Sequence, residues 1–336
     1  MEGNSQFIAP PLIKRFSHAA AGHEGVLRDE SGALLIKPCL PREVDFYQAA
    51  ASHAEFAKWM PTFMGTLQLN PQTAASLGDK PGVPPVPAVA PALPSSDRGE
   101  TSTRSDATVK KPLEICIVLS NLTYGFAKPC VLDVKLGARL WDDEAPLEKR
   151  ARLDGVADES TSRPLGMRIA GMKVWKGDNK AYQIYGKNYG RQFTADNAVD
   201  GFKEFLFSGK LSEEQSKLIA KRFADKVAEI QGVLENQESR MYSASLLFVY
   251  EGDADALDQA LQIEKEKDPS KGTLAEGEEE DEDDEEEDDE NKPPPRKVED
   301  LKIIDFAHAT WTPGQGPDLN ALHGVKSVLS LFRQLS

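Results

Sequence analysis

Apolar and polar positions follow two different periods along this chain, and each period predicts a kind of element. Residues 114–119 and 129–136 are short, mostly apolar runs typical of buried strands. Residues 218–234 instead carry apolar side chains three and four positions apart, which predicts a helix. The capping-box pattern Ser212-Glu213-Glu214-Gln215 precedes it and predicts where that helix begins.

A second set of signals lies near the N-terminus. Residues 22–37 predict a β-hairpin with its turn at Ser31-Gly32. Pro41 then predicts the first turn of a helix. A strand that ends in Lys37, followed by a helix that carries Glu43, is the arrangement with which kinase-like folds hold nucleotide phosphates. Taken alone it is weak evidence, because exposed lysine and glutamate residues are common.

Two segments lack either period and are predicted not to fold. Residues 81–112 are rich in Pro, Ala, Ser and Thr, and residues 264–299 contain an unbroken acidic run and a Pro triplet. They split the chain into three folded blocks. We expect these blocks to form an N-terminal lobe over residues 1–122, with the first segment as an insertion, and a C-terminal lobe over residues 123–336, with the second. A chain of 336 residues with 40% hydrophobic content is long enough to give each lobe a core.

The acidic run also explains the charge. The net charge is −15, but Glu276 and residues 278–290 supply 14 carboxylates, so the remainder is close to neutral and need not repel an anionic ligand. Cys39, Cys116 and Cys130 show no disulfide or metal spacing, which indicates a reducing compartment. With no apolar run of membrane-spanning length and no secretory leader pattern, we expect no integral membrane segment.

Chemistry is concentrated in residues 129–137, PCVLDVKLG. Asp133 and Lys135 are two residues apart in an apolar strand, so their side chains point to the same face. Burying both charges is costly unless they pair with each other or meet a ligand. The segment alone leaves both readings open, a structural ion pair or a binding site.

Pro129, Asp133, Lys135 and Gly137 match the PxxxDxKxG signature of the inositol polyphosphate kinases. The chain also resembles that family in a loose K-x-R-E-x-x-F-Y region near Lys37, in an S-L-L element near residue 245, and in the sequence I-D-F-A-H at residues 304–308, all in the family's order. The resemblance covers roughly residues 20–250 and 298–333. It implies a two-lobed, kinase-like α/β (α+β) fold of the inositol polyphosphate kinase or SAICAR-synthase type. Such a fold has antiparallel sheets, and here it would also carry disordered insertions.

The resemblance also implies a nucleotide site. Lys37 would bind ATP phosphates, with Glu43 fixing its position. Backbone groups of Ser120 and Leu122 would bond adenine, and Asp133 would bond the ribose or orient the acceptor hydroxyl. Asp305 would hold Mg²⁺, whose preferred ligands are one or two carboxylates together with phosphate oxygens.

On the substrate side, the resemblance assigns inositol-phosphate contacts to Lys135, Lys149, Arg152, Lys173 and Lys187, and places His308 near the substrate. Lys149, Arg152, Lys173 and Lys187 lie in a base-rich stretch that follows the signature, and a ring with several phosphates needs several bases nearby. Eight acids are interspersed between residues 138 and 191, so on charge alone a solvated surface is an equally good reading.

The implied function is transfer of the ATP γ-phosphate to inositol tris- and tetrakisphosphate, as in the multikinase branch, with fungal-type multikinases most alike. A hexakisphosphate kinase is the nearest alternative. A nuclear scaffold is another, in which the acidic run binds basic proteins such as histones or transcription factors. A solvated, solubilising insertion is an equally good reading of the run. We expect a monomer in the nucleus and cytoplasm, without direct nucleic-acid binding.

Overall fold

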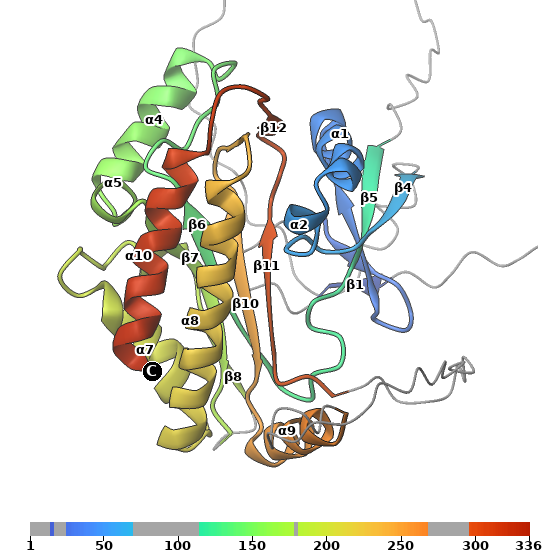
Figure 1. Cartoon of the computed structure of the whole chain (residues 1–336), viewed down its shortest axis with the longest axis vertical. Coiled ribbons are helices and arrows are strands. Elements are labelled where there is room, and N and C mark those ends of the chain that lie inside the picture. The colour runs from blue at the N-terminus through green and yellow to red at the C-terminus, as the bar shows by residue number, and fades with distance from the viewer. Residues whose placement is uncertain (1–13, 17–24, 70–113, 178–180, 268–295) are drawn as a thin grey trace, which may run out of the picture.

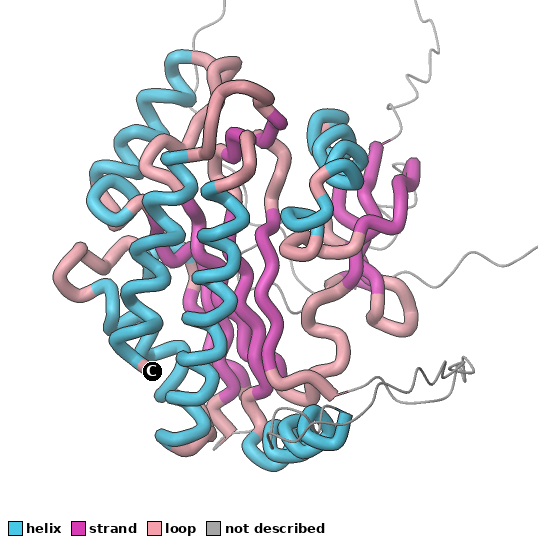
Figure 2. The backbone as a smooth tube through the Cα atoms, in the orientation of Figure 1, coloured by secondary structure: helices cyan, strands magenta, loops and turns pink. Residues whose placement is uncertain are grey.

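The computed structural model describes residues 14–16, 25–69, 114–177, 181–267 and 296–336. Over these ranges the chain forms two five-stranded antiparallel sheets and one pair of short strands. Figures 1 and 2 show the two sheets side by side, with most of the helices packed on the larger, C-terminal part.

The N-terminal sheet has the strand order β1-β2-β3-β5-β4. Its strands are β1 (Lys14–Arg15), β2 (Leu27–Arg28), β3 (Leu34–Pro38), β4 (Phe63–Leu69) and β5 (Glu114–Ser120). The hairpin expected from the sequence is formed by β2 and β3, with Leu27 opposite Ile36. The expected helix follows as α1 (Pro41–Ala49), continued by η1 (Ala50–Ser52) and α2 (Ala54–Ala57).

The C-terminal sheet has the order β11-β10-β6-β7-β8. It consists of β6 (Pro129–Leu136), β7 (Met167–Trp175), β8 (Tyr182–Tyr185), β10 (Ser245–Glu251) and β11 (Glu299–Ile304). The short strands β9 (Ser239–Met241) and β12 (Ala309–Trp311) pair beside it. The signature strand β6 therefore occupies the middle of the sheet, where both of its edges are hydrogen-bonded.

Two long helices, α8 (Glu213–Glu235) and α10 (Leu319–Leu335), run side by side over one face of this sheet (Figure 1). Phe248 of β10 contacts Phe223 of α8 and Phe332 of α10, with ring centroids 5.1 and 4.9 Å apart. The capping box at Ser212 is present, with Gln215 N donating to Ser212 Oγ. This packing buries one face of β6 in the core and leaves the face with Asp133 toward the other lobe.

The remaining helices surround the C-terminal sheet: α4 (Leu147–Asp158), α5 (Ser162–Leu165), α6 (Lys187–Gly190), α7 (Ala198–Phe207) and α9 (Ala254–Lys267). The prediction that residues 264–299 do not fold was too wide. Residues 264–267 end α9, which buries Leu257 and Ala260, and Glu299 begins β11 while bonded to Arg222. The insertion at 81–112 and the acidic run at 276–290 lie outside the described residues.

The two lobes meet along an aromatic contact. The Phe46 ring of α1 stacks on Phe306 at 4.8 Å and on Trp311 at 4.6 Å. Beside it, the Ile303 N–H donates to the Trp59 carbonyl at 2.6 Å. The segment that carries the I-D-F-A-H motif is thus held against the N-terminal lobe. No helix in the described ranges combines the length and apolarity needed to cross a membrane.

Candidate active site

A cavity between the two sheets is lined by apolar side chains with several polar and charged groups among them. Its lining consists of Phe16, Val26, Leu35, Lys37, Tyr47, Pro61, Leu119, Ser120, Asn121, Leu122, Thr123, Val131, Asp133, Leu247, Ile304 and Asp305. An apolar cavity with a few polar groups is the usual form of a cofactor site. Five of the residues to which the sequence analysis assigned nucleotide or metal contacts, Lys37, Ser120, Leu122, Asp133 and Asp305, line it.

Lys37 lines this cavity and contacts carboxylates from both lobes. Its ammonium donates to Glu43 Oε1 at 2.9 Å and to Asp305 Oδ1 at 3.0 Å. Glu43 is 1% exposed, on the first turn of α1. The predicted lysine–glutamate contact is therefore present, and Asp305 adds a second carboxylate from the C-terminal lobe.

These contacts keep Lys37 charged. Burial lowers the pKa of Lys37, but the negative charges of Asp305 and Glu43, and the hydrogen bonds to them, outweigh burial and raise the pKa above its usual value. A fixed positive charge at this point is suited to a phosphate group, because charge-assisted bonds to phosphate are strong.

Lys135 pairs with a distant carboxylate and not with its neighbour on the strand. Its ammonium donates to Asp305 Oδ2 at 3.1 Å, to Ser245 Oγ at 3.2 Å and to the Ser243 carbonyl at 3.3 Å. Asp133 lies on the same face of β6, as expected from the strand period, but in the nucleotide cavity. Asp305 thus lies between two lysines from opposite lobes.

The backbone at this point is unusual. Asp305 and Ser243 are the two non-glycine residues with positive φ in the described ranges, at 68° and 59°. Such conformations cost free energy and persist where the surrounding structure enforces them, commonly at functional sites. For Asp305, the left-handed conformation directly after β11 turns its carboxylate toward the two lysines.

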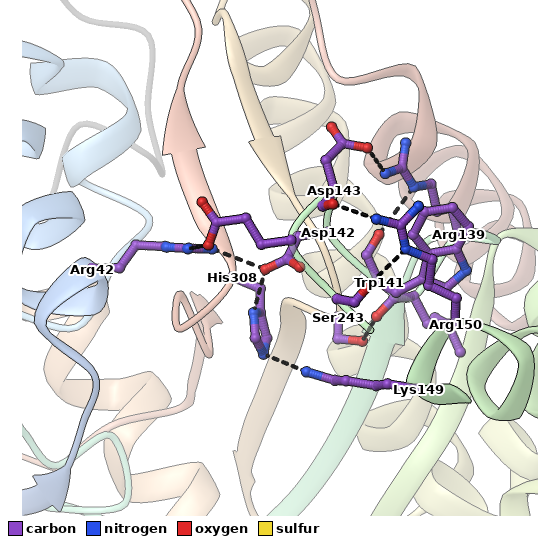
Figure 3. Close-up of polar contacts among 12 residues, drawn as sticks. Arg42, Arg139, Trp141, Asp142, Asp143, Lys149, Arg150, Ser243 and His308 are labelled. Carbon is purple, nitrogen blue, oxygen red and sulfur yellow. Dashed lines mark hydrogen bonds and ion pairs between the residues drawn. The ribbon is translucent and has the colours of Figure 1, made fainter. Parts of the chain in front are cut away.

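A second cavity adjoins the first and is lined by more polar residues: Lys37, Pro38, Cys39, Leu40, Glu43, Lys135, Tyr242, Ser243, Asp305, Ala307 and His308. Lys37 and Asp305 line both cavities. Lys149 of α4 reaches the second cavity through His308, with 3.4 Å between Lys149 Nζ and His308 Nε2 (Figure 3). The structure therefore brings together Lys135, Lys149 and His308, as the sequence analysis proposed.

The other predicted substrate contacts are placed differently. Lys173 is 4% exposed, and its ammonium lies 3.9 Å from the centre of the Tyr182 ring. In the register it lies opposite Val131, four residues along β6 from Lys135 and so roughly 13 Å away. The structure does not bring Lys173 into the group. Arg152 and Lys187 are exposed on α4 and α6.

Arg168, which was not assigned a role from the sequence, lies beside Lys135, where a substrate contact from Lys173 was expected. It lies directly opposite Lys135 in the β6–β7 register, and its Nη1 donates to Ser162 Oγ at 3.2 Å. Burial and the nearby positive charge of Arg191 lower the pKa of Arg168, although Asp133 acts in the other direction. A bound anion would relieve that repulsion. The sequence places Arg168 in the strand formed by residues 167–175. Only the register of that strand against β6 then identifies Arg168 as a candidate substrate contact.

The predicted adenine contacts need one refinement. The Ser120 N–H already donates to the Thr62 carbonyl at 2.9 Å, and the Asn121 N–H donates to the Ala33 carbonyl at 2.7 Å. A contact from the Ser120 backbone must therefore come from its carbonyl. Leu122 follows in the segment that joins β5 to β6 and lines the same cavity.

Comparison with known proteins shows the family. A family model described as inositol polyphosphate kinase matches residues 116–333. The chain belongs to the inositol polyphosphate kinase family. The resemblance drawn from the motifs is thereby confirmed, and so is the identification of an inositol phosphate kinase.

Two fungal relatives match over nearly the whole chain, and a third relative matches over two thirds of it. The inositol polyphosphate multikinase of Saccharomyces cerevisiae is 32% identical, covering 94% of this chain and 96% of its own. That of Schizosaccharomyces pombe is 31% identical, covering 96% and 98%. Human inositol hexakisphosphate kinase 2 is 33% identical over 66% of this chain and 51% of its own.

A solved structure shows the same fold. The crystal structure of the inositol phosphate multikinase from Saccharomyces cerevisiae, in complex with ADP and Mn²⁺, superposes with a TM-score of 0.63 at 29% identity. It covers 90% of this chain and 99% of that one. The expected kinase-like α/β fold with antiparallel sheets is therefore confirmed.

Proposed function

We propose that this protein is an ATP-dependent inositol polyphosphate multikinase, which phosphorylates inositol tris- and tetrakisphosphate toward pentakisphosphate. The observation that carries the proposal is that Lys37 and Asp305 line both cavities. Phosphoryl transfer requires the γ-phosphate and the acceptor hydroxyl to meet at one point, held by opposite charges. Lys37 and Asp305 mark that point.

The roles follow from the two cavities. The Ser120 carbonyl and the Leu122 N–H bond adenine, Asp133 bonds the ribose, and Lys37 holds the phosphates. Lys135 contacts the incoming ring, and Lys149, Arg168 and His308 contact its phosphates or hydroxyls. Arg168 replaces Lys173 in this set, while Arg152 and Lys187 extend it at the surface.

The donor set fits Mg²⁺. Asp305 supplies one carboxylate next to the phosphate-binding lysine, and the described residues contain no group of three or more His, Cys, Asp or Glu side chains that could enclose a metal by themselves. Mg²⁺ in kinases takes most of its remaining ligands from nucleotide phosphates and water. When bound at Asp305, Mg²⁺ would neutralise charge on the transferred phosphate.

The multikinase reading is favoured over a hexakisphosphate kinase by coverage. The yeast multikinases match over nearly their whole length, whereas the hexakisphosphate kinases match over about half of theirs. The test is chromatographic analysis of products from Mg-ATP with inositol trisphosphate, tetrakisphosphate or hexakisphosphate. We expect turnover of the first two, lost in Asp305→Asn. Turnover of hexakisphosphate alone would assign the rival activity.

We also propose a nuclear role for the acidic run, with the protein in both nucleus and cytoplasm. Its supporting observation is the 14 carboxylates within residues 276–290, which would attract basic proteins such as transcription factors. Deleting residues 276–290 should abolish capture of such a basic partner and leave turnover intact. Capture that persists after the deletion would remove the support for this role, and localisation of a tagged protein would test the compartment.

A further inference from the structure

A continuous polar chain leads from the N-terminal lobe to the second cavity (Figure 3). Arg42, on the first turn of α1, donates from Nη1 to Asp142 Oδ2 at 2.9 Å. The same carboxylate oxygen lies 2.7 Å from His308 Nδ1. The other ring nitrogen, Nε2, lies 3.4 Å from Lys149 Nζ. One oxygen of Asp142 therefore contacts both lobes.

These contacts determine where the imidazole proton is. A lysine ammonium has donors and no acceptor, so His308 Nε2 must accept from Lys149. In a neutral ring the proton is then on Nδ1, which donates it to Asp142. This is the opposite of the tautomer that an imidazole with no such partner prefers, and it places the Nε2 lone pair, which here accepts from Lys149, next to the cavity.

Asp142 is itself held firmly. It is 8% exposed, in the loop between β6 and α4. Its neighbour Trp141 lies between two guanidinium groups, those of Arg139 at 4.0 Å and Arg150 at 4.7 Å from the ring centre, and donates from Nε1 to Asp154 at 3.0 Å. The loop therefore has little freedom to move the carboxylate away from His308.

The electrostatics are consistent with an ionised carboxylate. Burial raises the pKa of Asp142, but the hydrogen bond from His308, together with the charge and hydrogen bond of Arg42, outweighs burial and lowers it below the usual value. An ionised Asp142 accepts from both donors at neutral pH.

We propose that Asp142 is a positioning residue, which fixes His308 in the Nδ1-protonated tautomer so that Nε2 and Lys149 are directed at the inositol phosphate. Arg42 makes this arrangement depend on contact between the lobes. The inference rests on the proposed kinase function. Glu43, the next residue on α1, holds Lys37, so two consecutive side chains orient the nucleotide side and the inositol-phosphate side.

The tautomer has a consequence for recognition. A lone pair at Nε2 accepts a hydrogen bond from a ring hydroxyl of the substrate, or from Lys149, whereas a fully ionised phosphate has no proton to donate. His308 held by Asp142 therefore favours a hydroxyl at this point of the ring, while Lys149 remains able to contact an adjacent phosphate.

The first test observes the proton directly. Long-range ¹H–¹⁵N spectra of the full chain, recorded at a pH where imidazoles are neutral, report the protonated nitrogen of each of the five histidines. His308→Ala assigns the signal. We expect Nδ1 to carry the proton, and Asp142→Asn to shift it toward Nε2. Asp143→Asn is the matched control, because Asp143 is the next residue, is exposed, and pairs with Arg139. An Nε2 proton in the unaltered protein would overturn the proposal.

The second test is kinetic. We expect Asp142→Asn to lower kcat/KM for the inositol phosphate roughly 10- to 100-fold, by analogy with the range seen when the outer partner of a metal-binding histidine is removed, with KM for ATP unchanged. Arg42→Met should act in the same direction by a smaller factor. In a His308→Ala background, Asp142→Asn should add less than about a twofold change, because its effect passes through that ring.

Equal costs of Asp142→Asn with and without His308 would show that Asp142 acts in another way and would refute the inference. Absence of turnover in the unaltered protein would instead refute the proposed function. The spectra would still decide the tautomer in that case, so the two failures are distinguishable.

Discussion

On the nucleotide side of the cleft, each central charge already contacts an opposite charge: Lys37 meets Glu43 and Asp305 within 3.0 Å, and Asp305 also meets Lys135. On the inositol-phosphate side, two bases instead contact neutral groups: Arg168 donates to Ser162 Oγ and is repelled by Arg191, and Lys149 contacts the imidazole of His308. The first region is ordered by its own ion pairs, whereas the second is arranged to gain from a bound anion.

This difference predicts two kinds of variant. Changes on the nucleotide side remove one partner of a buried ion pair, and so affect both folding and rate. Changes on the inositol-phosphate side break a hydrogen bond to Ser162 or to His308 and not a buried ion pair, and so should lower affinity for one substrate more than they lower stability.

The largest effect is expected for Lys37→Met. It removes the phosphate contact and leaves Glu43, which is 1% exposed, without its ammonium. We expect kcat/KM to fall roughly 10³-fold, and the free energy of unfolding to fall by about 3–5 kcal/mol. Steady-state kinetics and denaturant unfolding measure the two effects.

The double variant Lys37→Met/Glu43→Met separates the loss of activity from the loss of stability. Replacing both partners with apolar groups should restore most of the stability without restoring activity. If stability stayed as low as in the single variant, the ion pair would not be the cause of the loss.

Arg168→Ala should have the next largest effect, on substrate affinity alone. Loss of a charge-assisted bond worth about 1.5–3 kcal/mol raises KM for the inositol phosphate roughly 10- to 100-fold, with KM for ATP unchanged. Lys173→Met is the matched control, since Lys173 lies on the same strand but packs on Tyr182. A larger effect from Lys173→Met would restore the assignment made from the sequence alone.

A smaller effect is expected from Lys149→Ala. Lys149 is half-buried beside His308, while Arg152, on the same helix, is exposed. We expect a roughly tenfold rise in KM for the inositol phosphate, exceeding that of Arg152→Ala. Lys217→Ala, an exposed lysine on α8, should leave KM unchanged. Equal rises in KM for Lys149→Ala and Arg152→Ala would indicate that α4 acts only through its overall charge.

The smallest expected effect concerns pH. Because the folded-state pKa of Lys37 is raised, its contribution to stability is fully present below the usual lysine pKa of about 10.4 and is lost as pH rises through the higher folded value. The stability difference between the unaltered protein and the Lys37→Met/Glu43→Met variant should therefore be constant from neutral pH to about pH 10. A difference that already changed across that range would show that another group titrates with the pair.

Short-range patterns predicted the elements well. The β2–β3 hairpin, α1 from Pro41, strand β6 and the capped helix α8 all lie where the period and the turn residues placed them, because each depends on neighbours within a few residues. Lys37 and Glu43 were also predicted as a pair, since a strand end and the first turn of the next helix are near each other along the chain.

Contacts between distant segments were harder to predict. Lys173 was chosen over Arg168 because a motif match cannot give the register of β7 against β6, and the β-bulge after Asp133 alters that register. The roles of Arg42 and Asp142 were missed, because they come from separate lobes and are joined only when α1 packs against the C-terminal lobe.

The sequence by itself determined the family, the order of the elements and the identity of the charged residues, because motif spacing and periodicity are properties of the chain. Only the tertiary structure decided the partners of those charges. Lys135 and Asp133 are two residues apart on one face, yet Lys135 bonds Asp305, 170 residues away. The reason is physical: Ser245 of β10 pairs with Lys135 of β6 on one side and with Ile304, the residue before Asp305, on the other, and the half-buried ammonium bonds the carboxylate that this packing holds in reach.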